Sequence, residues 1–204
     1  MGALLKPENM GCNSLATDII PTCEALNKPG GVKREIYLGA IDDLDADGVT
    51  FGTDGDIEGL TFKATKGLVK VTGKIEKNSA SEPIEPEGEG NIAMYNHTVS
   101  LVIYHSTQAQ RAAIEDIVDL DRAFAIVPMR SGQIVVYGID ASDYREFGLK
   151  VSEGDDATGV NLNDMNAQTL TLAGRLTNKA ILFDEDETLA NNLSTIEGYL
   201  VSAV

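Results

Sequence analysis

The chain of 204 residues is long enough for one domain with a substantial core, because a domain of this size buries roughly 70% of its unfolded surface. It has 32 acidic against 16 basic residues, and the net charge of −16 excludes electrostatic binding to nucleic acid or an anionic membrane. No apolar run predicts a membrane span or a signal peptide. Two cysteines, Cys12 and Cys23, are too few for a disulfide framework, so we expect reduced thiols in a protein made in a cytoplasm.

Residues 1–32 have weak periodicity and several prolines and glycines, and we interpret them as an N-terminal arm with a short helix near residues 23–27. Strand-like alternation then begins. Segments 60–65 and 69–76 alternate with a period of two residues, which is typical of half-buried antiparallel strands. The Lys-Gly pair between them predicts a tight turn, and therefore a hairpin.

The most acidic segment is DDLDADGVTFGTDGDIEG, residues 42–59, which contains seven acidic residues and no basic one. Asp43, Asp45 and Asp47 have the spacing that opens an EF-hand calcium loop, but Asp54 stands where that loop needs a glutamate. The flanking segments also look like strands rather than helices. We therefore predict an acidic hairpin region with two Asp-Gly turns and a short strand between them, and keep a calcium site as the alternative.

The middle of the chain contains one long loop and one strong helical pattern. Residues 78–91, rich in Pro, Gly and Glu, predict an exposed loop, and the segment 94–105 predicts a strand. We predict a helix over residues 106–120, capped by Ser106 or Thr107. The apolar face of this helix, at helical spacing, consists of Ala109, Ala113, Ile114, Ile117 and Val118.

Strand patterns resume after the helix. Segments 123–129 and 133–139 are joined by Arg-Ser-Gly, which indicates a hairpin, and segments 146–153 and 168–176 form another candidate pair. A last apolar run precedes residues 184–204, which fit a helix in one part and a strand in another. We therefore predict a mainly β domain over residues 33–183, an antiparallel β-sandwich or barrel with one flanking α-helix, followed by a C-terminal extension.

The sequence shows no recognisable catalytic or metal motif. His97 and His105 are too far apart along a strand to share a metal, and two histidines with two cysteines lack the paired spacing of a zinc site. A glycine-rich match at residues 88–93 has a loop before it and a strand after it, whereas a dinucleotide site needs a strand and then a helix. We expect no enzyme and no catalytic, cofactor-binding or metal-binding residues.

The order of these elements resembles the tail tube proteins, or major tail proteins, of tailed bacteriophages over roughly residues 33–183. The resemblance rests on LTFKATKGLVKVTGKIE, the loop NSASEPIEPEGEGN, the strand TVSLVIY, the helix QAQRAAIEDIVD and the phrase NLNDMNAQTLTLAG. It implies a β-sandwich subunit that forms stacked, hexameric rings, with the loop at residues 78–91 reaching a neighbour. It also implies a protein made in the bacterial cytoplasm and located in the virion tail.

The expected partners are therefore further copies of the chain, other tail or connector proteins, and viral DNA that passes without specific binding; no membrane is expected. A negatively charged lumen would keep DNA from adhering, which requires Asp and Glu on the lumenal wall. The alternatives are another virion ring, connector or decoration protein, a calcium-binding surface or adhesion β-domain, and an enzyme of unrecognised type.

Overall fold

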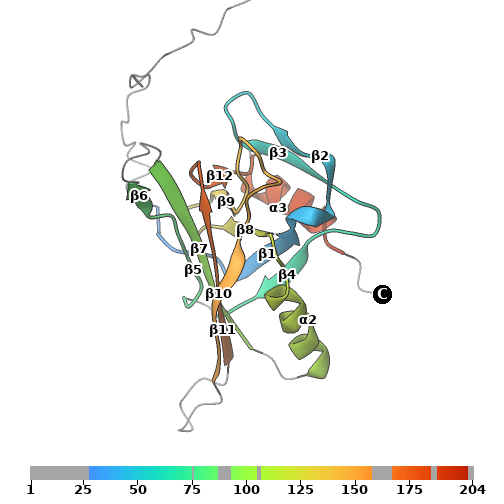
Figure 1. Cartoon of the computed structure of the whole chain (residues 1–204), viewed down its shortest axis with the longest axis vertical. Helices are drawn as coiled ribbons and strands as arrows, with labels where there is room; N and C mark the ends of the chain where they lie inside the picture. Colours follow the sequence, from blue (N-terminus) through green and yellow to red (C-terminus); the bar gives the residue numbers. More distant parts are fainter. Residues whose placement is uncertain are drawn as a thin grey trace, which may run out of the picture.

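The computed structural model describes residues 28–74, 76–86, 93–104, 107–157, 167–184 and 188–201. The fold is mainly β, with antiparallel sheets packed as in a sandwich and with two helices (Figure 1). The described strands close no barrel, so the sandwich alternative of our prediction is confirmed. None of the described helices is both long and apolar enough to cross a membrane.

Sheet one is buried on both faces. Its strands, in spatial order, are β12 (Ile181–Leu182), β9 (Ile134–Tyr137), β8 (Ala123–Pro128), β1 (Glu35–Ala40) and β4 (Val69–Thr72). All six residues of β8 are buried. Leu38 pairs with Ala125 and contributes to one core, whereas the next pair, Tyr37 with Ile126, contributes to the core on the opposite face. This sheet therefore lies between two hydrophobic cores.

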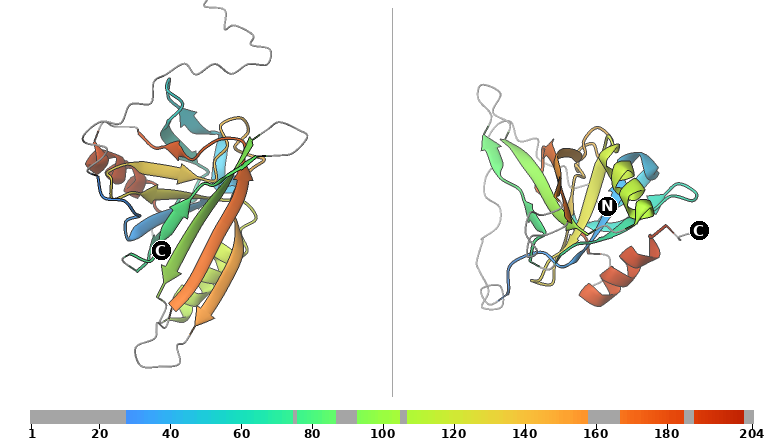
Figure 2. Two further views of the ribbon diagram at one scale, coloured as in Figure 1. Left: turned by 90° about the vertical axis from the view of Figure 1, so that its left-hand side faces the viewer. Right: turned by 90° about the horizontal axis from the view of Figure 1, so that it is seen from below.

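Sheet two covers one face of sheet one. Its strands are β10 (Lys150–Ala157), β11 (Ala167–Leu176), β7 (Ala93–Ile103) and β5 (Ser79–Ser81), and β6 (Ile84–Pro86) pairs with another part of β7. The pairs Val99–Leu172 and Leu101–Leu170 turn toward sheet one and form the first core. Figure 2 shows the long strands of sheet two running steeply across those of sheet one.

Helix α2 (Gln108–Val118) confirms the helix predicted within residues 106–120. The Thr107 hydroxyl accepts a hydrogen bond from the backbone N–H of Gln110, and the Gln110 side-chain oxygen accepts one from the backbone N–H of Thr107, which completes a capping box. Ser106 lies outside the described residues. Only Ile114 and Ile117 are buried, in the first core, while the other three residues of the predicted apolar face are exposed. The buried face is therefore narrower than its spacing predicted.

A second helix corrects the expectation of one flanking helix. Helix α3 (Leu189–Gly198), capped by Thr188, inserts Ile196 into the second core. It shares that core with the hairpin of β2 (Leu44–Phe51) and β3 (Ile57–Phe62), which follows the short 3-10 helix η1 (Ile41–Asp43). The segment 184–204 contains both the helical and the strand-like pattern seen in its sequence. It forms α3 first, and Leu200 then makes a parallel β-bridge with Leu68.

The predicted hairpin between segments 60–65 and 69–76 is wrong. β3 pairs with β2, whereas β4 pairs with β1 in a different sheet, so the chain passes from the hairpin layer into sheet one between them. Leu68, just before β4, forms backbone hydrogen bonds with the C-terminal segment. Its N–H donates to the Tyr199 carbonyl, and its carbonyl accepts from the Val201 N–H. Tertiary pairing overrides the local Lys-Gly turn signal here.

The loop predicted at residues 78–91 is also wrong in part, because β5 and β6 within it pair with β7. Backbone pairing needs no apolar side chains, so a polar segment can complete this edge of the sheet. Residues 87–92 lie outside the described residues. The other two predicted pairs are confirmed: β8 with β9 around Gly132 (φ +96°), and β10 with β11.

Gly39 gives a test of packing in sheet one. A Cβ added there would lie 2.5 Å from Cζ of Phe124, its cross-strand partner. We expect Gly39→Ala to lower the free energy of unfolding by about 1–3 kcal/mol through overpacking, measured by urea denaturation. The control is Gly198→Ala at the end of α3, where an added Cβ meets no atom within 4 Å. Its stability should be unchanged or higher by up to about 1 kcal/mol. Equal stability of the two variants would contradict this packing.

Candidate functional site

The acidic segment 42–59 folds as one hairpin with one turn, rather than two turns. Its second Asp-Gly pair forms the turn, where Gly55 has φ +86° and the Gly52 N–H donates to the Asp56 carbonyl at 2.9 Å. The first pair lies inside β2, at a shift in pairing register, and the Gly48 N–H donates to the Tyr144 hydroxyl there. The predicted short strand is thus the second half of β2.

Cations of the same chain contact the part of this segment considered for calcium. Lys66 Nζ lies 3.1 Å from a carboxylate oxygen of Asp43, and Arg122 pairs with Asp42. Arg145 donates to the carbonyl oxygen of Asp45 at 2.8 Å. In the described part of the chain, no three His, Cys, Asp or Glu side chains gather in a way that could hold a metal.

The fully buried His97 has a structural environment. Its Nδ1 accepts from the Gly138 N–H at 3.2 Å, which leaves Nε2 to donate to the Asn178 carbonyl at 2.9 Å. Burial lowers the pKa of His97, against the opposing effect of the Asn178 carbonyl, so the ring is neutral. His105 lies outside the described residues. His97 therefore joins the loops that follow β9 and β11.

A buried carboxylate joins the same two loops. Asp140 accepts hydrogen bonds from the backbone N–H and the hydroxyl of both Ser142 and Thr177. Burial alone would raise the pKa of Asp140, but these hydrogen bonds together lower it, and the group is ionised. The Asp-x-Ser turn is visible in the sequence, whereas Thr177 is too distant along the chain to be found without the fold.

The outer face of sheet two carries many small hydroxyl side chains. Cross-strand pairing brings Ser100 opposite Thr171, with their hydroxyl oxygens 2.9 Å apart, and Ser79 pairs with Ser100 on the other side. The hydroxyl residues of this face, exposed or half-buried, are Ser79, Ser81, Thr98, Ser100, Thr169 and Thr171. They alternate with the residues that form the first core.

One edge of this sheet is open. β10 pairs with β11 on one side, and no described strand pairs with Lys150–Ala157 on the other. Glu153 and Asp155 are exposed on this strand, in register with Thr171 and Thr169 of the hydroxyl face. Arg111 of α2 lies 3.7 Å from Asp156 at the far end of the strand. The hydroxyl face and this edge form a continuous surface, which we name the sheet-two surface.

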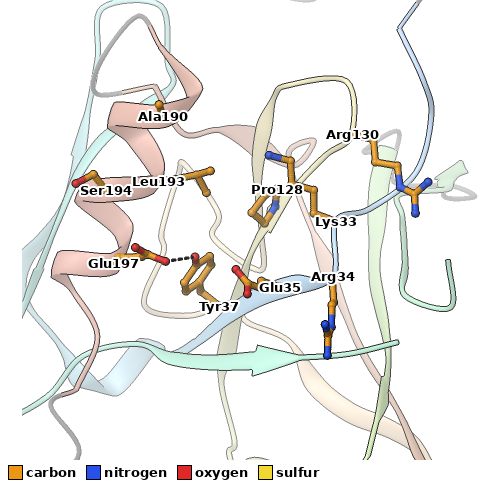
Figure 3. A pocket seen from close by; sticks show the side chains of 10 residues that line it. All are labelled: Lys33, Arg34, Glu35, Tyr37, Pro128, Arg130, Ala190, Leu193, Ser194 and Glu197. Atoms are coloured by element: carbon orange, nitrogen blue, oxygen red, sulfur yellow. Dashed lines mark hydrogen bonds between the residues drawn. The ribbon is translucent and has the colours of Figure 1, made fainter. Parts of the chain in front are cut away.

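The largest cavity described, of about 570 Å³, lies between α3 and the strands β1 and β8 (Figure 3). Lys33, Arg34 and Arg130 stand opposite α3, and we name this site the basic cavity. Its two carboxylates, Glu35 and Glu197, both bind Lys70, at 3.0 and 3.1 Å.

The hydrogen bonds that Lys70 donates to Glu35 and Glu197 raise the pKa of Lys70 to about 12. Tyr37 also donates a hydrogen bond to Glu197 at 3.4 Å. One lysine thus pairs with both carboxylates of the basic cavity, which leaves one negative charge in excess, whereas the cations on the opposite wall have weaker partners. Sequence reasoning missed this cavity because its walls come from segments about 60 to 160 residues apart.

Comparison with known proteins adds no relative. No family model matches the chain, and neither the curated proteins nor the solved structures searched contain a match. The predicted relationship to tail tube proteins therefore stays a prediction, and the function has to be argued from the surfaces described above.

The buried carboxylate predicts a pH-dependent loss of stability. Asp140→Asn places an amide NH₂ against N–H and hydroxyl donors, and we expect it to lower the free energy of unfolding at pH 7 by about 1–3 kcal/mol. The pKa of Asp140 is lower in the folded than in the unfolded chain, so its stabilising effect is present above about pH 4 and is lost as the pH falls further.

Urea denaturation at pH 7 and at acid pH measures this difference. The exposed Asp116→Asn in α2 is the control, with a change within about 0.5 kcal/mol. A difference between Asp140→Asn and the parent that persists undiminished at low pH would show that the charge of Asp140 is not what matters.

Proposed function

We propose that the protein is a self-assembling structural subunit that forms rings and, by stacking of rings, a tail tube of a bacteriophage virion. The observation that carries the proposal is the sheet-two surface. A well-packed domain leaves one sheet face exposed or half-buried and lined largely by hydroxyl groups, and the outer side of the eight-residue edge strand β10 has no described partner.

An open edge strand is a liability in an isolated β protein. Its unpaired N–H and C=O groups bind any available strand, and monomeric proteins usually shorten, bend or cover such edges. β10 contains one bulge, between Val151 and Glu153, but five successive paired residues follow it. A second copy that adds a strand to this edge would satisfy these groups, as in β-augmentation. Repeated head to tail, this contact closes a ring or grows a filament.

The bare face has the chemistry expected of a wall that DNA passes without adhering to it. Small hydroxyl groups present no apolar patch, and the carboxylates of Glu153 and Asp155 stand on the same face near the open edge. Two cations, Lys150 and Arg175, are also on this face, and Arg175 Nε lies 3.2 Å from Glu85. A phosphate backbone would find few free cations here.

Under this proposal the partners are other copies of the chain and adjoining tail or connector proteins, and the role is structural rather than catalytic. The protein is then made in the host cytoplasm and located in the virion. A connector, terminator or decoration protein would use the same kind of edge, and the shape of the assembly distinguishes these proteins: tubes grow by stacking, whereas a connector stops at one ring.

Assembly of the isolated protein tests the proposed contact between copies. Purified full-length protein at high concentration should form rings or tubes visible by negative-stain electron microscopy, because the β10 edge is free to pair with another copy. Discrete rings without tubes would favour a connector. A monomer at every concentration tested would overturn the proposal.

The charge of the outer face of sheet two can be reversed to test whether this face lines the path of DNA. Glu153→Lys/Asp155→Lys should make assembled protein retain double-stranded DNA at low salt. The two substitutions replace carboxylates with cations that bind phosphate, and they change the charge by four units per subunit. The control is Glu115→Lys/Asp116→Lys on α2, which makes the same charge change elsewhere on the surface. Co-sedimentation of DNA with the assemblies is the measurement. Equal retention by both variants would show that this face does not line the DNA path.

A further inference from the structure

A patch of opposite charge lies close to the basic cavity. Asp54 and Asp56 at the hairpin turn, together with Asp184 after β12, line a hollow of about 480 Å³ that also contains the exposed Leu182. We name it the acidic patch. Lys179 is its one cation, and no ion pair within 4.0 Å joins it to these carboxylates in the described residues. Asp184 accepts a hydrogen bond from Asn192 at 3.1 Å.

The acidic patch and the basic cavity belong to one continuous face. Between them lies a smaller hollow of about 180 Å³ with mostly uncharged walls. Leu182 and Asp184 line both this hollow and the acidic patch. On its other side, Gly132 belongs to the same β-turn as Arg130 of the basic cavity, and the hollow also contacts α3. Positive and negative groups thus stand side by side on the same face.

The cations of the basic cavity are incompletely neutralised. Arg130 Nη1 lies 3.5 Å from Glu76, whose side chain is 73% exposed, so this pair is weak and exchangeable. Arg34 donates through Nε to the Gly73 carbonyl, a neutral acceptor. Lys33 has no carboxylate within ion-pair distance in the described part of the chain. In a chain with two acidic residues for each basic one, three such cations around one cavity are available to an acidic partner.

We propose that this face binds the same face of a second copy of the chain, related by two-fold symmetry. A half-turn places the acidic patch of each copy on the basic cavity of the other, and both contacts form at once because the two charged regions are adjacent. The exposed Leu182 of each copy then comes opposite the apolar lining of the cavity, Pro128 and Leu193.

Charge selects this occupant over an unrelated apolar surface. Two copies, each at −16, repel one another at long range, so association in random orientations is unfavourable. The proposed orientation is the one in which the few available cations meet carboxylates. This contact uses α3, the β8–β9 turn and the hairpin turn, none of which belongs to the sheet-two surface, so it does not rest on the proposed ring assembly.

Charge-reversal variants analysed by sedimentation velocity test the proposal. The parent protein should form a dimer that weakens as salt is raised. Lys33→Glu/Arg130→Glu and Asp54→Lys/Asp56→Lys should each weaken dimerisation by at least about tenfold, since two-fold symmetry counts every substitution twice. An equimolar mixture of the two variants should restore a heterodimer, because the reversed, acidic cavity of one then meets the reversed, basic patch of the other, while the second contact stays as in the parent.

The control is Glu115→Lys/Asp116→Lys, which changes the net charge as much as the acidic-patch variant does but should leave dimerisation unweakened. A parent that stays monomeric at low salt, variants that dimerise like the parent, or a mixture that fails to associate would each overturn the two-fold contact. The two proposals can fail separately. Charge-reversed protein that no longer dimerises but still forms rings or tubes would leave the sheet-two contact intact, whereas a parent protein that forms dimers but no rings or tubes would support the two-fold contact alone.

Discussion

The structure depends on a sheet that is buried on both of its faces. β8 has no polar position, and its neighbours β1 and β9 place alternate residues in two separate cores. Such a sheet cannot exist without a layer on each side, since either face alone would expose a large apolar surface. Sheet two with α2 supplies one layer, and the β2–β3 hairpin with α3 supplies the other. Gly39 is required inside this arrangement because the Phe124 ring occupies the space over it.

The same constraint explains which surfaces are left over. Sheet two is an outer layer, so its inner face packs on the core while its outer face can carry hydroxyl groups such as those of Ser100 and Thr171. β10, at the margin of that layer, has no described partner beyond β11. On the opposite side of the molecule's central sheet, α3 lies beside the β8–β9 turn and leaves the hollows that hold Arg130 and Asp184.

Much of the fold could be predicted from local patterns. The capped helix at Thr107 and the β8–β9 hairpin around Gly132 were visible because their signals lie within a few residues of one another. The pairing of β4 was not, because its partner β1 is more than 30 residues away and the nearby Lys-Gly turn suggested β3 instead. The strands β5 and β6 were missed since backbone pairing, not side-chain pattern, places them on β7.

The candidate surfaces were harder to predict, because they join residues that are distant along the chain. Lys33 and Arg130 meet at one cavity through the antiparallel order of β1 and β8, and Thr177 reaches Asp140 across two loops. Neither set leaves a spaced motif. The sequence did indicate the excess of acid, and the fold adds where cations are concentrated and which edge is unpaired. The proposed assembly through the sheet-two surface rests on those placements.

Hydrogen exchange of the β10 backbone tests this central claim most directly. Exchange measured by mass spectrometry on dilute and on concentrated protein reports whether the open edge acquires a partner. Pairing with a second copy predicts that amides within residues 150–157 exchange much more slowly in the concentrated sample, while those of the buried β8 are unchanged. The same exchange rate for β10 at both concentrations, under conditions where assemblies form, would contradict it.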